Sequence, residues 1–347
     1  MYGIEGRFMK LSVYPLNLDL KTTFRVSHGA SDQRRNALVK IEHDGMVGYG
    51  EAAAVFYYGD TQESLSAYLN GLPPLGDDPF ALEAMLNALP EGPHAARAAV
   101  DIALHDLWGK LLGQPLYKLF GLTPAPLPQT SFTVGMDAPE TMAARVKESN
   151  YPIIKVKLGA DEAEACVSAI RKVSAARLRV DANAAWSPDQ ALDLIARLAP
   201  YDLELIEQPL ASGDAEAYRW LKNELDQRGI RTPIFIDESA QDSRDAARHA
   251  GAVDGVVVKL MKTGGLREAL RMIHTARAHG MKVMLSCMIE SSLGVTAAAH
   301  LAPLCDQLDL DGPLLVANDP FDGLRYDGAA PSLPDRPGIG VLPRQTL

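Results

Sequence analysis

Three acidic residues end three successive short apolar segments of the sequence. They are Asp181 in LRVDAN, Glu207 in LELIEQP and Asp237 in PIFIDES. Such segments are typical of strands buried in a parallel sheet, where a charge is costly unless it is paired or bound to a metal. Oxygen ligands without histidine or cysteine favour Mg²⁺, with Mn²⁺ as the alternative, over zinc. Any one of these acids alone could cap the following helix, but the three together predict one divalent-cation site.

Lysines flank these three acids along the chain. Lys155 and Lys157 lie in IIKVK before them, and Lys259 ends GVVVK after them. Because alternate residues of a strand share a face, Lys155 and Lys157 are expected to face the mouth of the site together. Two ammonium groups this close repel each other, which is expected to lower their pKa values and make a lysine usable as a base. Lys262, in KLMKTGG, competes with Lys259, but its place past the strand end favours a solvated or anion-binding lysine.

A cation between opposed amines predicts proton transfer at the carbon next to a carboxylate. The metal would hold the substrate carboxylate and stabilise the enediolate formed when the α-proton leaves. One lysine would take the proton and the other would return one to the opposite face, which inverts the α-carbon. With a single acting lysine, the same groups would serve β-elimination or cycloisomerisation. Asn183 and Glu238 adjoin the acids and are expected to orient the ligands rather than bind the metal.

These residues need a scaffold that brings several strand ends together. Short apolar segments begin near residues 131, 153, 178, 203, 234, 255, 282 and 307, and most of them are separated by stretches that could form helices. Eight strands alternating with helices predict a parallel barrel of the TIM type, whose functional groups lie at the C-terminal ends of its strands. A doubly wound open sheet is the alternative, but SFTVGMDAPE, after the first strand, lacks the glycine-rich phosphate loop of that fold.

The N-terminal part of the chain has a different pattern, typical of an α+β domain. Residues 10–19 and 36–52 alternate apolar and polar side chains, with a hairpin turn at Asp44-Gly45. Helical patterns follow near residues 61–70, 79–88 and 93–113. The proline-rich segment 123–128 marks a boundary. We therefore predict a capping domain over 1–126, a barrel over 127–315, and a C-terminal segment, 316–347, that returns to the capping domain.

Composition limits the possible partners and location of the protein. The chain has 347 residues, 47% of them hydrophobic and 22% charged, which suits a globular protein with a buried core. Its net charge of −10 argues against a nucleic-acid partner. Three cysteines without zinc spacing favour a reducing cytoplasm, and no apolar stretch reaches membrane-spanning length. Residues 1–8 contain Ile4-Glu5-Gly6-Arg7, which looks like a protease site added for expression, so the natural start is expected at Met9.

The motifs KVK, DAN, EQP, DES and KLMKTGG, in this order, resemble those of the enolase superfamily, muconate-lactonizing subgroup. The resemblance extends over nearly the full chain from about Met9. It implies an α+β capping domain, completed by the C-terminal tail, and a modified barrel whose first unit begins with SFTVG. It also implies Mg²⁺ on the three acids named above, Lys157 and Lys259 as the acid/base pair, and Lys155 as a stabiliser of the enolate.

Within that subgroup the chain looks most like the dipeptide epimerases of the L-Ala-D/L-Glu type. The resemblance assigns the Asp309-Leu310-Asp311 segment to the α-ammonium group of a dipeptide; two carboxylates suit a cation, although a solvated strand cap is the alternative. Arg25 resembles the arginine that meets a glutamate carboxylate in these enzymes, or it is a surface residue. The other substrate contacts implied are Thr133, Met288 and Glu290.

The sequence thus predicts a Mg²⁺-dependent epimerase that inverts the C-terminal residue of an Ala-Glu-like dipeptide. A muconate cycloisomerase or an o-succinylbenzoate synthase is the alternative, although their substrates lack the ammonium group that suits Asp309 and Asp311. A non-catalytic binding protein on the same scaffold is a third hypothesis, opposed by the presence of every metal ligand and both lysines. The expected partners are a small dipeptide and further copies of the chain, with no nucleic acid or membrane.

Overall fold

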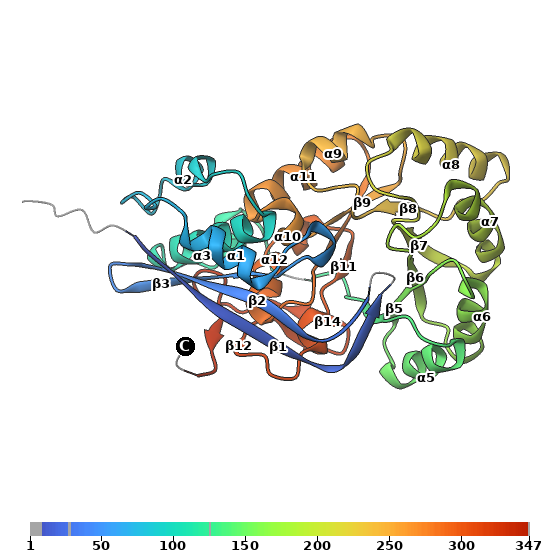
Figure 1. Cartoon of the computed structure of the whole chain (residues 1–347), viewed down its shortest axis with the longest axis horizontal. Coiled ribbons are helices and arrows are strands. Elements are labelled where there is room, and N and C mark those ends of the chain that lie inside the picture. Colours follow the sequence, from blue (N-terminus) through green and yellow to red (C-terminus); the bar gives the residue numbers. More distant parts are fainter. Residues whose placement is uncertain (1–8, 27–28, 125, 346–347) are drawn as a thin grey trace, which may run out of the picture.

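The chain folds into a sheet-and-helix cap that lies against one parallel barrel (Figure 1). The computed structural model describes residues 9–26, 29–124 and 126–345. The segment before the predicted start at Met9 lies outside the described residues. Within the described residues, no helix combines the length and apolar character needed to cross a membrane.

The cap contains a three-stranded antiparallel sheet. Its strands pair in chain order and are β1 (Lys10–Val26), β2 (Gly29–His43) and β3 (Met46–Ala52). Its helices are α1 (Gln62–Asn70), α2 (Leu82–Ala88), α3 (His94–Leu111) and α4 (Leu116–Leu119), with a 3₁₀ turn η1 (Phe56–Tyr58) before them. Helix α3 packs directly on β3 because glycines let the two backbones approach. A Cβ atom on Gly50 would lie 1.9 Å from the carbonyl oxygen of Ala99.

The second part is the predicted barrel of eight parallel strands. In spatial order they are β4 (Phe132–Val134), β5 (Ile153–Lys157), β6 (Arg177–Asp181), β7 (Leu203–Glu207), β8 (Ile234–Ile236), β9 (Gly255–Val258), β10 (Lys282–Ser286) and β11 (Gln307–Asp309). A parallel bridge between Thr130, just before the first strand, and Leu308, in the last strand, brings the two edges of the sheet together, so the barrel is nearly closed. The prediction of a TIM-type barrel with an α+β cap is confirmed, and the open doubly wound sheet is wrong.

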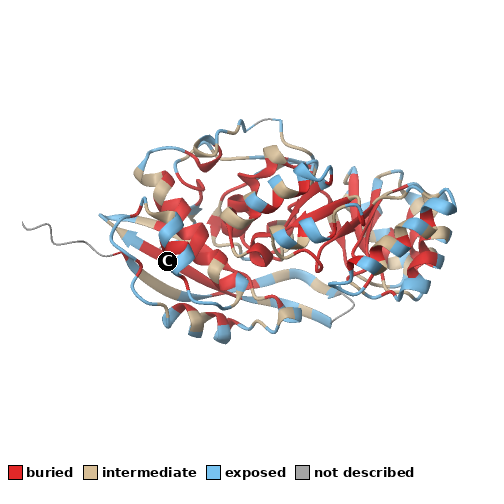
Figure 2. Cartoon of the chain, turned by 90° about the horizontal axis from the view of Figure 1, so that it is seen from above, coloured by how far each residue is buried: buried red, intermediate tan, exposed pale blue. Residues whose placement is uncertain are grey.

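Helices cover the outside of the barrel. They are α5 (Pro139–Ser149), α6 (Ala163–Val173), α7 (Pro188–Leu198), α8 (Ala215–Gln227), α9 (Ser243–Arg248), α10 (Leu260–Thr263), α11 (Leu266–Ala278) and α12 (Ser292–Ala299). Buried residues concentrate in the strands, and in helices where they face the strands or the cap (Figure 2). Helix α12 is buried along its whole length because it lies between the barrel and the cap, and it contacts β3, β10 and the short C-terminal strand β12 (Phe321–Asp322). This contact joins the two parts through a continuous apolar core.

The C-terminal segment lies against the cap. Its short strands are β12 (Phe321–Asp322), β13 (Arg325–Asp327), β14 (Ala330–Ser332) and β15 (Leu342–Pro343). Isolated bridges connect Leu20 to Val316 and Pro115 to Gly338, and the backbone N–H of Asp19 donates to Asn318. The division into segments 1–126, 127–315 and 316–347 stays a prediction.

The sequence did not predict the full length of the first hairpin. Strands β1 and β2 continue past residues 19 and 36 as far as the pair of Val26 with Gly29, with a register irregularity between Asp19 and Phe24. This distal part is polar and mostly exposed, so it lacks the apolar alternation that marks a strand. The hairpin passes over the barrel, where the N–H of Met136 donates to the carbonyl of Arg25 (Figure 1).

Candidate active site

Inside the barrel, a layer of apolar side chains supports the predicted site. This layer is a separate buried cluster of Leu205, Phe235, Val257 and Met284. A polar residue follows each of them two positions later in the chain. These polar residues are Glu207, Asp237, Lys259 and Ser286. Because alternate residues of a strand share a face, the polar groups point into the barrel above the apolar layer. The strands therefore fix the polar groups at one end of the barrel.

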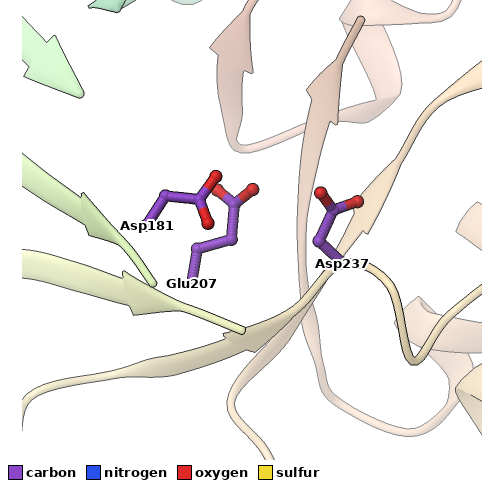
Figure 3. Close-up of side chains that lie close together, drawn as sticks. All are labelled: Asp181, Glu207 and Asp237. Carbon is purple, nitrogen blue, oxygen red and sulfur yellow. The ribbon is translucent and has the colours of Figure 1, made fainter. Parts of the chain in front are cut away.

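The three predicted acids converge at that end. Asp181, Glu207 and Asp237 each offer a carboxylate oxygen, and these oxygens lie within 4.8 Å of one another. All three carboxylates are buried and turn toward a common point (Figure 3). The Oε2 atom of Glu207 is buried and accepts no hydrogen bond from the described residues, which leaves a free ligand position. Three hard oxygen donors with such a position fit a divalent cation of the magnesium type.

Lysines contact the acids from opposite sides of the barrel. The Nζ atom of Lys157, on β5, lies 2.5 Å from Asp181, and that of Lys259, after β9, lies 2.5 Å from Asp237. Lys155 lies 2.8 Å from Glu207, 2.9 Å from Asp309 and 3.2 Å from Asp181. The ammonium groups of these three lysines therefore lie beside the carboxylates, so positive and negative charges at the site offset one another.

The expected lowering of the lysine pKa values by mutual repulsion is wrong for Lys155. Burial lowers the pKa of Lys155, but the carboxylates of Asp309 and Glu207 outweigh burial and raise it well above its usual range. The pKa of Lys259 is raised in the same way, chiefly by Asp237. Reasoning from the two neighbouring lysines alone omitted the acids that strands β6, β7 and β8 bring beside them. A cation among the carboxylates would oppose this effect.

Lys262 does not behave as the sequence predicted. The residue is fully buried, and its ammonium lies 2.6 Å from the Oδ1 atom of Asp237. It also donates to the carbonyls of Ala240 and Val257, each at 3.0 Å, and to that of Asp237. Burial lowers the pKa of Lys262. The prediction that Lys262 is solvated is therefore wrong, because the turn into α10 directs the side chain inward to Asp237.

Polar side chains beside the triad hold its backbone. The N–H of Asn183 donates to Asp181 at 2.9 Å, and its side-chain amide donates to Glu238 at 3.1 Å. Gln208, which the sequence analysis did not single out, accepts hydrogen bonds from the N–H groups of Asp237 and Ser239, at 2.8 and 3.1 Å. Its place in the EQP motif was the available signal. These contacts tie the end of β7 to the end of β8.

Asp309 and Asp311 lie together at the end of β11, both buried. Asp309 is bound by Lys155 and by the hydroxyls of Ser131 and Ser286, at 2.6 and 2.9 Å, while Asp311 accepts from the N–H of Thr133 at 2.6 Å. Burial and the neighbouring Asp309 raise the pKa of Asp311 to about 7. A cationic ligand next to Asp311 would favour its charged form. The alternative of a solvated strand cap is wrong, because both acids are buried.

A cavity of about 400 Å³ opens over these groups. Polar residues from the first strand, β4, to the last strand, β11, form its floor. They are Thr133, Lys155, Lys157, Asn183, Lys259, Asp309 and Asp311. Met288, which the sequence analysis named as a substrate contact, lines one side. Arg25 is absent from the lining, because its exposed side chain is directed toward Asp137, 3.9 Å away. The cap supplies the opposite wall.

Glu290 was predicted to contact substrate, but it is turned away from the cavity. It is buried among the loop backbone, where its carboxyl accepts from the N–H of Met288 at 2.8 Å. A Cβ atom on Gly294 would lie 2.2 Å from its Oε2 atom, so that glycine makes room for the carboxyl. Burial and the adjacent buried Glu51, on β3, raise the pKa of Glu290 to about 8. This prediction is corrected: Glu290 lies at the contact between barrel and cap.

Replacing Glu290 with glutamine is expected to stabilise the protein increasingly as pH rises. The folded protein holds this proton up to about pH 8, whereas the unfolded chain releases it near the usual pKa of 4.5. Wild-type stability therefore falls between these two pKa values as pH rises, by on the order of a few kcal/mol, and glutamine removes that loss. Unfolding by urea at pH 5 and pH 9 measures the effect. An equal difference between variant and wild type at both pH values would contradict it.

Two protein-family descriptions match the chain. Residues 9–121 match the mandelate racemase / muconate lactonizing enzyme N-terminal domain, and residues 137–346 match the enolase C-terminal domain-like family. The chain is 41% identical over 348 residues to an L-Ala-D/L-Glu epimerase of Bacteroides thetaiotaomicron, covering 98% of this chain and 89% of the relative. Cap and barrel both lie within this alignment.

Solved structures agree with these matches. The chain aligns with a substrate-liganded complex of the L-Ala-D/L-Glu epimerase from Bacillus subtilis at a TM-score of 0.91 and 31% identity, covering 97% of this chain and 99% of the other. A dipeptide epimerase from Enterococcus faecalis, complexed with Mg and the dipeptide L-Leu-L-Tyr, aligns at 0.89 and 32% identity, with coverage of 96% and 99%. The first of these relatives is named for Ala-Glu, whereas the second is complexed with L-Leu-L-Tyr.

Proposed function

Because this chain belongs to the mandelate racemase/muconate lactonizing enzyme family of the enolase superfamily, we propose that this isomerase is a Mg²⁺-dependent dipeptide epimerase. It would invert the α-carbon of the C-terminal residue. One observation carries the proposal: Lys157 and Lys259 contact different members of one carboxylate triad from opposite sides of a single cavity. That arrangement supports the proposal, because it would put one proton donor or acceptor on each face of a bound α-carbon.

The residues present fit the metal that the proposal requires. Asp181, Glu207 and Asp237 would hold Mg²⁺, with Mn²⁺ as the alternative, and the unpartnered Oε2 atom of Glu207 supports this. When bound, the metal would polarise the substrate carboxylate and so stabilise the charge that develops as the α-proton leaves. Lys155, held between the triad and Asp309, is positioned to donate a hydrogen bond to the same carboxylate.

The two other lysines would move the proton. Lys157 comes from β5 and Lys259 follows β9, so four strands separate them around the barrel. A base on one side removes the α-proton, and the ammonium on the other side delivers a proton to the opposite face. Because both side chains are buried and held by carboxylates, their positions are restrained before a substrate binds. Inversion is the outcome of this geometry.

A dipeptide fits the rest of the cavity better than the substrates of the sibling enzymes. Asp309 and Asp311 present two carboxyls to the cavity, and a free α-ammonium group would pair with them. A muconate or a succinylbenzoate precursor would bring a carboxylate or a carbonyl to this place and leave Asp311 without a cation. The acid pair therefore favours epimerisation of a dipeptide over cycloisomerisation and over o-succinylbenzoate synthesis.

Incubation in D₂O with Mg²⁺ tests the proposal. We expect deuterium to enter the α-position of the C-terminal residue of a dipeptide, with formation of the epimer, as detected by NMR. Acetylation of the dipeptide N-terminus removes the ammonium and is expected to lower kcat/KM by about 10- to 100-fold. Absence of exchange across a broad dipeptide panel, or turnover of a muconate instead, would contradict the proposal. A binding protein would retain dipeptide without exchange.

A further inference from the structure

An arginine interrupts the apolar layer inside the barrel. The members of this layer come from β7 to β10, and each precedes a polar residue of the site by two positions. On β6 the corresponding position, two residues before Asp181, is occupied by Arg179. The Arg179 side chain is buried, and its Nη1 atom lies 3.5 Å from the sulfur of Met284 in the layer. This buried guanidinium has no role in the mechanism above.

One end of the guanidinium is held by Glu204 of β7. The Nε atom of Arg179 donates to the carboxylate of Glu204 at 2.6 Å. Glu204 is an extra residue at a register irregularity between β6 and β7, so it has no partner on β6. An irregularity of this kind redirects a side chain, and here it accompanies the ion pair. Stability alone does not require that pair, because replacement of a buried ion pair by apolar side chains is often neutral or stabilising.

The other end of the guanidinium reaches Asp309 through one hydroxyl. The Nη1 atom of Arg179 donates to the carbonyl of Leu308 at 2.7 Å and to the Oγ atom of Ser131 at 3.3 Å. That hydroxyl donates in turn to Oδ1 of Asp309 at 2.6 Å. The carbonyl of Leu308 also accepts from the N–H of Ser131 at 3.2 Å, so both of its lone pairs are used. Because a guanidinium only donates and the nearby carbonyl is filled, the Ser131 proton is directed to Asp309.

These contacts hold both oxygens of the Asp309 carboxylate. Oδ2 accepts from Lys155 and from the hydroxyl of Ser286, each at 2.9 Å, and Oδ1 accepts from Ser131. Burial raises the pKa of Asp309, but Lys155, the Ser131 hydroxyl and Arg179 outweigh burial and lower this pKa below its usual range. Asp309 therefore presents a charged carboxylate in a fixed orientation on the cavity floor.

We propose that Arg179 is a positioning residue that fixes the carboxylate of Asp309 through the hydroxyl of Ser131, and that binding of the substrate ammonium group depends on this relay. The inference rests on the proposed function and concerns a residue that does not line the cavity. Without the guanidinium, the carbonyl of Leu308 becomes free and the Ser131 hydroxyl can turn to it. Among the described residues, Oδ1 of Asp309 then keeps the 3.4 Å contact of Thr133. The carboxylate loses the support that holds a binding group in place.

Acetylation of the substrate provides the test, because it removes the ammonium group that Asp309 would meet. The dipeptide that wild type exchanges fastest and its N-acetyl derivative would be assayed by α-proton exchange in D₂O with Mg²⁺. We expect the ratio of their kcat/KM values, free over acetylated, to fall about 10-fold in Arg179→Met and in Ser131→Ala. In the double variant the ratio should fall no further, because both residues act through one relay. Partial unfolding leaves the ratio unchanged, since both substrates meet the same active fraction.

Two further variants make the test specific. Arg177, on the same strand, binds the other carboxylate oxygen of Glu204 at 3.0 Å from an exposed position. Arg177→Met is therefore the matched control and should keep the wild-type ratio. Arg179→Lys keeps a buried cation but loses the planar fork that meets Glu204 and Ser131 together. It is expected to lower the ratio as Arg179→Met does, and it takes the place of that variant if methionine prevents folding.

The outcomes separate this inference from the proposed function. If kcat/KM fell equally for the free and the acetylated dipeptide in Arg179→Met, the arginine would only join the strands, and the inference would be overturned. A ratio that fell in Arg179→Met but not in Ser131→Ala would overturn the relay through the hydroxyl. If wild type itself did not distinguish the two substrates, the inference would fail while epimerisation stood. If wild type exchanged the α-proton of no dipeptide in a broad panel, the proposed function would fail as well.

Discussion

Lys157→Met is expected to abolish epimerisation while leaving α-proton exchange with one of the two epimers. Removal of a positioned acid/base group lowers the rate by about 10²- to 10⁴-fold, and inversion needs both groups. Lys259 would remain, held by Asp237, and would still remove the α-proton of the epimer that faces it. Its ammonium then exchanges with solvent, so deuterium enters that epimer without inversion. Methionine keeps the unbranched stem and removes only the charged group.

The reciprocal variant makes the test specific. Lys259→Met should retain exchange with the other epimer, because Lys157 remains beside Asp181. NMR of each epimer in D₂O separates exchange from inversion, and circular dichroism checks the fold of each variant. Lys282→Met, an exposed lysine at the start of β10, is a control that should keep both activities. If either variant still inverted its substrate, or if both exchanged the same epimer, the two-lysine arrangement would be refuted.

Much of this site follows from the sequence because strand periodicity fixes it. Glu207 and Asp237 end apolar strands, and the rule that active groups lie at the C-terminal ends of barrel strands places them together without coordinates. Lys155 and Lys157 share a strand face for the same reason. The apolar layer beneath them, formed by Leu205, Phe235, Val257 and Met284, is the physical basis of this regularity. The fold class followed from the same eight strands.

Contacts that the alternation of residues along a strand does not determine were not predicted. Lys262 resembles a surface lysine in the sequence, but a turn directs it to Asp237. Glu290 lies beside Glu51 of the cap strand β3, and Gly294 of α12 leaves room for its carboxyl. The distal part of the first hairpin was missed because its residues are polar, so no apolar alternation marked it as a strand. The surroundings of Glu290 depend on how cap and barrel meet, because the neighbouring Ser291 donates to Glu51, 240 positions away in the sequence.

Removal of metal from the carboxylate triad is expected to inactivate the protein without unfolding it. Without a cation, Lys155, Lys157 and Lys259 pair with the three acids, so the charge at the site is nearly balanced. We therefore expect protein treated with EDTA to stay folded but inactive. Added Mg²⁺ should raise the melting temperature as its concentration rises. At a hundredfold excess over Kd, the free energy of unfolding is expected to increase by about 2.7 kcal/mol.

Glu207→Gln should remove both effects of Mg²⁺. The variant loses one ligand charge, so we expect the Mg²⁺-dependent shift in melting temperature to vanish and kcat/KM to fall by about 10³-fold or more. Thermal unfolding across a Mg²⁺ titration, with calorimetric binding, measures this without reference to turnover. Glu216→Gln, at the exposed start of α8, is the matched control and should keep both effects. A Glu207→Gln protein with the wild-type Mg²⁺ response would show that the ion binds elsewhere, and fully active metal-free protein would show that the triad only balances the lysines.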